Sequence, residues 1–180
     1  MKNRAIIPLL IFIAMAGLFL VVLNKINQGE YNPRDIPTEF IGREVPQFDL
    51  PELLDKNQRV TPADFAGKPW LLNVWGTWCA ECWREHNYLL QLSRNGIPIV
   101  GLNWRDEEQE AKKFLSDKGN PFAAVGFDPK SDAVIDLGVY GAPETFLVDA
   151  AGVIREKHKG ALHPQIWQEK FARYFDGSKQ

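Results

Sequence analysis

Two cysteines at C-x-x-C spacing are the residues of this chain best suited to chemistry. Cys79 and Cys82 are the only cysteines, and they follow an apolar run, Trp70 to Trp75, and a short Gly76-Thr77 turn. The apolar run predicts a buried strand, so the cysteines stand where a helix should begin. Unpaired backbone N–H groups and the positive end of the helix dipole favour a thiolate there. A thiolate attacks disulfides, and a second thiol one turn away resolves the product. The pattern predicts a two-electron dithiol–disulfide centre.

Other uses of a C-x-x-C pair fit this chain less well. Zinc needs about four ligands, but there is no second cysteine pair, and His86, His158 and His163 follow no zinc-finger spacing. Haem attachment requires C-x-x-C-H, and Trp83 stands where that histidine would be. A purely structural disulfide is an alternative, although a bridge across so short a loop restrains the unfolded chain little. We therefore expect a redox site that uses no metal ion and no cofactor.

The remaining sequence predicts the elements that would hold this pair. Residues 45–50 and 58–60 are expected to form a short N-terminal β-hairpin, and Thr61-Pro62 begins a single helical turn. There follow a strand at 70–75, a helix from 79 to about 93, a strand at 97–103, a helix capped by Asp106, a strand at 122–127, a hairpin of 145–148 with 153–159, and a final helix from His163-Pro164. This order predicts an α/β fold, with a central mixed sheet flanked by helices.

The first 23 residues are expected to be a transmembrane anchor. Lys2 and Arg4 precede an uncharged apolar stretch from Ala5 to Leu23. As a helix this stretch spans roughly 28 Å, close to the ~30 Å hydrocarbon core of a bilayer. A cleaved signal peptide is the alternative, but the only A-x-A pattern, at 14–16, lies inside the apolar run. With a retained anchor, the positive-inside rule places the N-terminus in the cytoplasm and the cysteines outside it.

After the anchor we expect a polar linker at 24–44 and one globular domain at 45–180. The linker contains Gly29, Pro33 and Pro37 and has no apolar period, which is typical of a tether. The globular part is long enough for one domain with its own core. The formal net charge of −2 provides no basic footprint, so we expect no nucleic-acid partner.

The sequence resembles the thioredoxin superfamily in two places. W-C-x-x-C after a buried strand is one signature, and Pro143, which opens the second predicted hairpin, is the other. The resemblance covers about residues 47–175 and implies a thioredoxin-like fold. It also implies that the bond before Pro143 is cis, and that this proline lies against the cysteine pair, where it helps to bind substrate backbone.

A narrower resemblance is to the membrane-tethered cytochrome c maturation thioredoxins of CcmG/DsbE type. It rests on W-C-A-E-C-W-R-E-H at 78–86, G-V-Y-G-A-P-E-T-F at 138–146 and the apolar N-terminus. It implies a single-pass protein of the bacterial inner membrane with its domain in the periplasm. Such a protein reduces disulfides of apocytochrome c or of a maturation protein that carries a thiol pair, and a transmembrane thiol reductant re-reduces it. The implied site consists of Cys79 as attacking thiol, Cys82 as resolving thiol, Glu85 as a nearby acid, and a substrate groove of Tyr140, Pro143 and Glu144.

Four residues near the cysteines carry further expectations. Asn73 stands where general thioredoxins usually have a buried acid, so proton handling would fall to Glu85, at i+3 from Cys82; a solvated surface carboxylate is the alternative for Glu85. Glu81, between the cysteines, opposes a nearby thiolate, which predicts a reduction potential nearer about −270 mV than −120 mV. Trp78 is expected to lie over the cysteines and to report their redox state by its fluorescence.

The sequence thus predicts a membrane-anchored thiol:disulfide oxidoreductase that acts as a reductant in cytochrome c maturation. Two alternatives stay open. One is a general extracytoplasmic thioredoxin-like protein disulfide reductase. The other is a module that binds thiol-bearing polypeptides without turnover.

Overall fold

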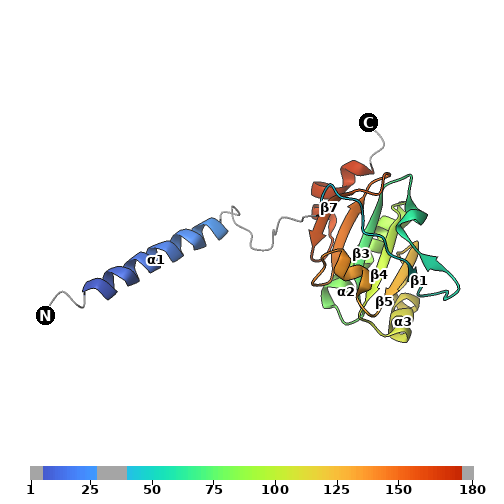
Figure 1. Ribbon diagram of the computed structural model, residues 1–180, viewed down its shortest axis with the longest axis horizontal. Coiled ribbons are helices and arrows are strands. Elements are labelled where there is room, and N and C mark those ends of the chain that lie inside the picture. Colours follow the sequence, from blue (N-terminus) through green and yellow to red (C-terminus); the bar gives the residue numbers. More distant parts are fainter. Residues whose placement is uncertain (1–5, 28–39, 176–180) are drawn as a thin grey trace. The chain divides into compact units, whose positions relative to one another are not determined.

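The N-terminal helix forms a unit of its own. We describe the protein from a computed structural model that defines residues 6–27 and 40–175 (Figure 1). The chain divides into two units, residues 1–37 and residues 38–180. Helix α1 covers Ile6–Asn27 and so continues past Leu23, the predicted end of the anchor. The predicted linker at 24–44 lies largely outside the described residues, and so do Lys2 and Arg4.

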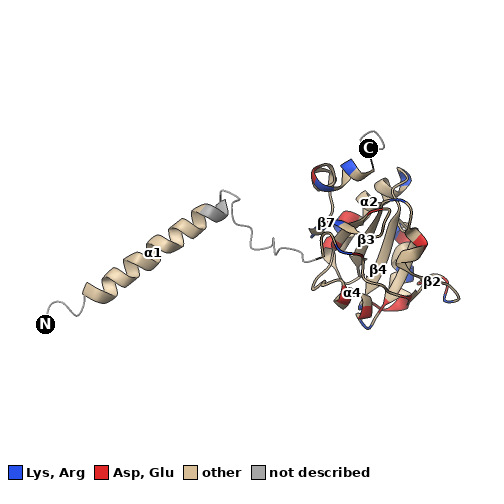
Figure 2. Ribbon diagram, turned by 45° about the horizontal axis from the view of Figure 1, so that its top comes forward, with Lys and Arg blue, Asp and Glu red and all other residues tan. Residues whose placement is uncertain are grey.

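Helix α1 is apolar on every side. From Ile6 to Asn24 it is long and apolar enough to cross a membrane. Its described side chains include no Lys, Arg, Asp or Glu, whereas the second unit carries both signs of charge (Figure 2). A signal sequence near an N-terminus meets the same criterion of length and composition, so the helix fits either a membrane anchor or a signal sequence.

The second unit is an α/β domain whose elements follow the predicted order. They are β1 (Leu50–Pro51), β2 (Arg59–Val60), a 3₁₀ turn (Pro62–Phe65), β3 (Trp70–Trp75), α2 (Ala80–Arg94), β4 (Ile99–Trp104), α3 (Glu108–Lys118), β5 (Ala124–Asp128), α4 (Asp132–Asp136), β6 (Glu144–Val148), β7 (Ile154–Lys159), α5 (Pro164–Ile166), a π-helical turn (Trp167–Phe171) and a 3₁₀ turn (Ala172–Tyr174).

The five main strands form one mixed sheet in the order β5-β4-β3-β6-β7. Strands β3, β4 and β5 are parallel, and β6 and β7 each run antiparallel to the neighbouring strand. The predicted mixed sheet is therefore confirmed. The N-terminal β-hairpin is confirmed as well, with β1 and β2 pairing at Leu50↔Val60 and Pro51↔Arg59. Central strand β3 is buried along its whole length and ends directly before the cysteine loop.

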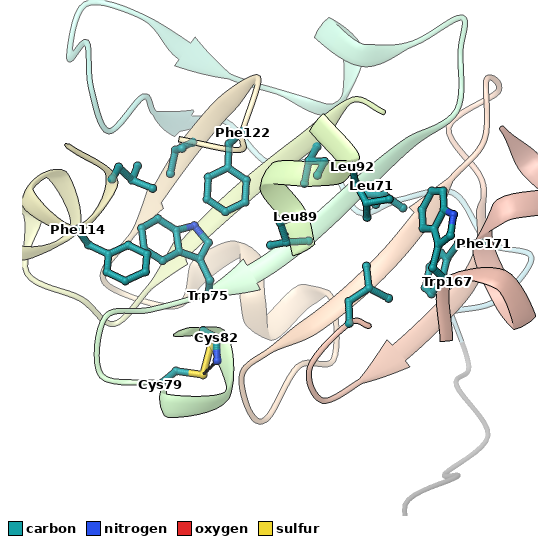
Figure 3. Packing of buried hydrophobic residues seen from close by; sticks show 14 of the residues in the cluster. Leu71, Trp75, Cys79, Cys82, Leu89, Leu92, Phe114, Phe122, Trp167 and Phe171 are labelled. Atoms are coloured by element: carbon teal, nitrogen blue, oxygen red, sulfur yellow. Dashed lines mark hydrogen bonds between the residues drawn. A yellow bond between two sulfur atoms is a disulfide. The ribbon is translucent and has the colours of Figure 1, made fainter. Parts of the chain in front are cut away.

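Each face of the sheet has its own apolar core, because successive strand residues point to opposite faces. Leu71 and Trp75 of β3 belong to a core with α2, α3 and the C-terminal helical turns, and this core also contains both cysteines (Figure 3). Leu72 and Val74 face the other way and pack with α4, β6 and the segment that begins at Val45. The cysteine pair is thus built onto the core at the end of the central strand.

Three predicted elements are wrong in detail. Of the segment 45–50 only Leu50 lies in a strand; Val45 instead donates its N–H to Gly152 O (2.8 Å). Asp106 does not cap α3, because Glu107 occupies the N-cap position. The Asp106 carboxylate instead accepts the backbone N–H of Thr77, in the loop before Cys79. The final helix is not one α-helix: its π-helical turn leaves Trp167 and Phe171 stacked (ring centroids 6.1 Å apart) and both buried.

Candidate active site

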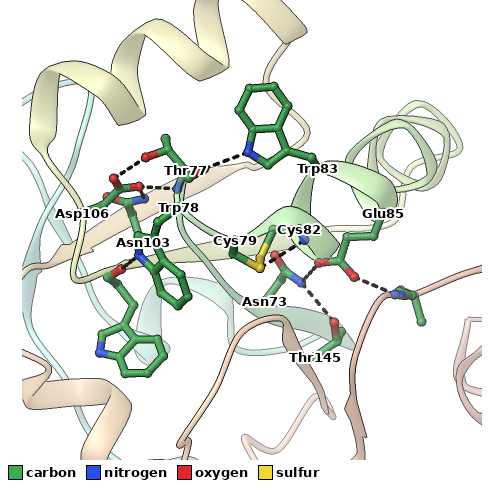
Figure 4. Close-up of a disulfide and its surroundings, with 12 residues drawn as sticks. Asn73, Thr77, Trp78, Cys79, Cys82, Trp83, Glu85, Asn103, Asp106 and Thr145 are labelled. Atoms are coloured by element: carbon green, nitrogen blue, oxygen red, sulfur yellow. Dashed lines mark hydrogen bonds between the residues drawn. A yellow bond between two sulfur atoms is a disulfide. The ribbon is translucent and has the colours of Figure 1, made fainter.

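The two cysteines lie at the start of α2, as predicted. Cys79 is the N-cap residue of this helix, with an extended backbone conformation, and its Sγ accepts the Cys82 N–H at 3.1 Å. A disulfide joins Cys79 and Cys82, whose Cα atoms are 5.3 Å apart, so the structure shows the oxidised form (Figure 4). Both residues are buried. After reduction, the same free N–H groups and the helix dipole would favour a thiolate at Cys79.

Glu85 is buried one helical turn after Cys82, which excludes the alternative of a solvated surface carboxylate. Its side chain joins three elements that are far apart in the sequence. Oε1 accepts the Asn73 Nδ2–H of β3 at 2.9 Å, and Oε2 accepts the backbone N–H of Leu162, after β7, at 2.6 Å. Asn73 Nδ2 also donates to Thr145 Oγ1 of β6 at 3.0 Å. All four residues are almost inaccessible to solvent, with Glu85 only 1% exposed.

Burial raises the pKa of Glu85 from its ordinary value of 4.5 to about 7. The loss of hydration, which disfavours the charged form, is the largest cause. The hydrogen bonds from Leu162 and Asn73 favour the carboxylate and oppose this effect, and the charge of Glu81 adds slightly to it. A carboxyl group with such a pKa exchanges its proton near neutral pH, which suits a proton acceptor or donor beside a thiol.

Pro143 follows a cis peptide bond from Ala142, as the resemblance implied. It directly precedes β6, which pairs antiparallel with β3, so its place in the chain is at the same end of the sheet as the cysteine loop. Tyr140, in the loop before it, is 90% exposed and free to contact a substrate. The cis bond is confirmed; the roles of both residues in a groove stay predictions.

Glu144, the third residue of the predicted groove, is occupied by an internal partner. Its carboxylate forms a buried salt bridge with Lys157 Nζ of β7 at 2.7 Å. Lys157 Nζ also lies 4.6 Å from the centre of the Phe146 ring. Burial raises the pKa of Glu144 and lowers that of Lys157, while their mutual attraction opposes both shifts. This placement argues against a direct contact between the Glu144 carboxylate and a substrate.

Trp78 packs against another tryptophan beside the cysteine loop. Its indole Nε1 donates to Trp104 O at 3.0 Å, and its ring meets the Trp104 ring edge-on at 5.6 Å. A Cβ on Gly76 would lie 2.4 Å from Trp78 Nε1, so the glycine is required for this close approach. Trp78 remains half-exposed, and its fluorescence response to the redox state stays a prediction.

Sequence reasoning missed several residues of the site because their partners are remote. Thr145 and Leu162 bind the Asn73–Glu85 pair from 72 and 77 positions away. Lys157 lies in the predicted hairpin segment 153–159, and no local signal in the sequence marks it as buried. Asp106, which followed a strand and preceded acidic residues, looked like a helix cap.

Among the described residues no group of three or more His, Cys, Asp or Glu side chains is placed to hold a metal ion.

Comparisons with a family model, with related sequences and with solved structures all lead to the same family. The Redoxin family matches residues 41–174. The thiol:disulfide interchange protein DsbE of Vibrio cholerae is 42% identical over 175 residues, which are 97% of this chain and 95% of that protein. The protein of the same name from Escherichia coli is 46% identical over 173 residues, with 94% and 92% covered. A crystal structure of a protein assigned as DsbE from Chlorobium tepidum matches with a TM-score of 0.62 and 30% identity, covering 74% of this chain and 92% of that one. The chain therefore belongs to the Redoxin family and is a thiol:disulfide oxidoreductase of the DsbE type with a thioredoxin-like fold.

Proposed function

We propose that this oxidoreductase acts as a reductant in cytochrome c maturation, with its domain held in the periplasm by an N-terminal anchor in the inner membrane. The observation that carries the proposal is the placement of Cys79 at the N-cap of α2, with Cys82 at bonding distance and buried Glu85 one turn further. Such a placement favours thiolate attack by the first cysteine and leaves the second to resolve the product.

The reaction proceeds in two exchanges. In the first, the Cys79 thiolate attacks one sulfur of the substrate disulfide; a Cys79–substrate disulfide forms, and the other substrate sulfur leaves as a thiolate that takes up a proton. In the second, the Cys82 thiolate attacks Cys79 Sγ, which releases the second substrate thiolate and forms the Cys79–Cys82 disulfide. Two electrons pass from the protein to the substrate. The oxidised structure corresponds to the end of this half-reaction.

Glu85 is proposed to take the proton that Cys82 gives up before the second exchange. It follows Cys82 by one helical turn, and both side chains belong to the buried region at the base of the loop. With a pKa of about 7, Glu85 is partly ionised at neutral pH and can accept the proton of Cys82. Its protonated form is also acidic enough to give the proton back when the reaction runs in reverse.

The cytochrome c assignment is supported by the likeness of residues 78–86 and 138–146 to the maturation thioredoxins. We propose apocytochrome c, or a maturation protein that carries a thiol pair, as the substrate, and a transmembrane thiol reductant as the electron donor. Tyr140 and cis-Pro143 are the proposed contacts for substrate backbone near Cys79. The apolar helix α1 supports the membrane part of the proposal.

The proposal is tested by trapping substrates on the full-length chain in native membranes. Cys82→Ala should hold a mixed disulfide on Cys79 because the resolving thiol is missing. The matched control is Cys79→Ala, which keeps Cys82 and should capture nothing. Captured chains are identified by mass spectrometry after non-reducing purification.

The identity of the captured chains decides between the candidate functions. Capture confined to C-x-x-C-H polypeptides or their handling partners would establish the cytochrome role. A broad set of unrelated secreted proteins would make this a general reductase with the same chemistry. Capture by Cys79→Ala instead of Cys82→Ala would reverse the assigned roles of the two thiols, and capture by neither would favour a binding module without turnover.

A further inference from the structure

Every polar group of Thr77, two residues before Cys79, is bound by a side chain from elsewhere. Its backbone N–H donates to Asp106 Oδ2 at 2.6 Å, and its hydroxyl donates to Asp106 Oδ1 at 2.5 Å. Its carbonyl oxygen accepts the Trp83 Nε1–H at 2.8 Å. Figure 4 shows these contacts on the side of the loop away from Glu85. The chain that leads into Cys79 is therefore held by one bidentate carboxylate and one indole.

Asp106 is itself fixed in the turn between β4 and α3. Its Oδ2 accepts the Asn103 Nδ2–H at 2.9 Å, and its Oδ1 accepts the Glu107 N–H at 3.0 Å. The preceding residue, Arg105, has a positive φ of 48°, and its guanidinium Nε donates to Ser131 Oγ at 2.9 Å. Positive φ is uncommon for a residue with a side chain and persists where the surroundings impose it. The turn is thus built in a way that directs Asp106 at Thr77.

We propose that Asp106 is a positioning residue for Cys79: by clamping Thr77 it fixes the loop from Gly76 to Trp78 and so holds the attacking sulfur at the N-terminus of α2. This role replaces the helix cap predicted from sequence, because the N-cap of α3 is Glu107. The inference rests on the proposed role of Cys79 as the attacking thiol, but it does not depend on which disulfide that thiol attacks.

The contact that depends on this clamp is the one at the N-cap of α2. Cys79 Sγ receives the Cys82 N–H only while the N-cap residue keeps its extended conformation next to the first turn. If Thr77 is released, the loop can move, and the thiolate loses part of the stabilisation from the N–H and the helix dipole. The titration midpoint of Cys79 in the reduced protein should then rise.

A double-mutant cycle on Thr77 and Asp106 tests this dependence. The reduced full-length chain in detergent is alkylated with iodoacetamide from pH 4 to pH 10, and modification of Cys79 is followed by mass spectrometry. Thr77→Val removes the hydroxyl donor but keeps the side-chain shape and every carboxylate, including Glu81 and Glu85 of α2 and Asp106. We expect it to raise the Cys79 midpoint by about half a pH unit or more.

The decisive comparison is the same substitution in the Asp106→Ala background. If Asp106 acts through Thr77, the effect of Thr77→Val should vanish there, because the bond is already lost. An equal shift in both backgrounds, or no shift in the wild-type background, would overturn the inference. Asp106→Ala also removes a charge and leaves the part-buried Thr77 N–H unpaired, so Thr77→Ser provides an independent test. Serine keeps the hydroxyl that valine lacks, and the Cys79 midpoint of this variant should therefore equal the wild-type value.

Two controls separate this inference from the proposed function. Asp117→Ala removes a carboxylate within α3, which is exposed and paired with Lys113, and should leave the Cys79 midpoint unchanged. In the wild-type chain, faster alkylation of Cys82 than of Cys79 would contradict the assigned roles of the thiols themselves. Faster alkylation of Cys79 that is insensitive to Thr77→Val would leave those roles standing and refute only the role of Asp106.

Discussion

The carboxyl group of Glu85 should make the stability of the oxidised protein fall as the pH rises from about 4.5 to 7. Its pKa is about 7 in the folded state, against an ordinary value of 4.5. Between these values the folded protein binds more protons than the unfolded chain, so raising the pH favours unfolding. The difference of roughly 2.5 units corresponds to about 3 kcal/mol, at ~1.36 kcal/mol per unit. This cost is absent below pH 4.5, where the group is protonated in both states, and fully present above pH 7.

The perturbation that isolates this effect is Glu85→Gln, which keeps the size of the side chain and removes its titration. Denaturant unfolding of the oxidised full-length chain in detergent, followed by tryptophan fluorescence, gives the unfolding free energy at each pH. The wild-type value minus the Glu85→Gln value should fall by about 3 kcal/mol between pH 4.5 and 8. Taking this difference removes the opposing contributions of His86 and His158, whose pKa values are lowered by burial.

A control and a refuting result follow from the same experiment. Glu81→Gln removes a half-exposed carboxylate that pairs with Arg84 in the first turn of the same helix. Because the charge of Glu81 adds only slightly to the raised pKa of Glu85, this variant should keep most of the wild-type pH slope. Parallel curves for the wild type and Glu85→Gln would show that the hydrogen bonds from Asn73 and Leu162 compensate fully for burial. In that case a pKa near 7, and with it the proposed proton transfer, would be refuted.

Three further predictions concern neighbouring groups. Lys157→Met leaves the Glu144 carboxylate buried without its cation and should cost about 3–5 kcal/mol of unfolding free energy at neutral pH, and less at acid pH. Adding Glu144→Leu to this variant should restore most of the lost free energy, and additive losses from the two substitutions would contradict the pairing. Asn73→Leu removes a donor to ionised Glu85 and should raise its carboxyl midpoint by about one unit in ¹³C NMR titrations; an unchanged midpoint would count against the bond. Because Glu81 opposes the thiolate, the reduction potential, measured by equilibration with dithiothreitol, should lie near about −270 mV, and a value above about −150 mV would exclude that.

The parts of the fold that follow from local pattern could be predicted from the sequence. The apolar run 70–75 became a fully buried strand within its predicted bounds, and Cys79 became the N-cap of the helix that follows. In both cases the signal lies within a few neighbouring residues. The hairpin of β6 and β7 was predictable for the same reason, since a turn at Asp149 to Gly152 separates two short runs of strand-forming residues.

The parts that depend on remote partners could not be predicted. The helical spacing places Glu85 on the same face as Cys82, but its burial is decided by Asn73, 12 positions earlier, and by Leu162, 77 positions later. Asp106 has the type and place of a helix cap, and only the folded chain shows that Thr77, 29 positions earlier, takes its carboxylate. Single-sequence patterns carry no information about such pairings, so the polar contacts of the site had to come from the structure.

The way the sheet ends at its two edges limits how a substrate can be recognised. At β5 the outer edge is already occupied: Leu53 N–H donates to Val125 O at 2.8 Å, and the Glu52 carboxylate accepts the Val125 N–H at 3.1 Å, as an additional strand would. At β7 the first residue, Ile154, exchanges hydrogen bonds with residues 42 and 43, and the strand continues with R-E-K-H-K, charges that discourage edge-to-edge association. Along the described residues of this five-stranded sheet, a client polypeptide therefore finds no free, neutral edge to extend by strand addition, and we expect its capture to depend on the loops at the ends of the strands.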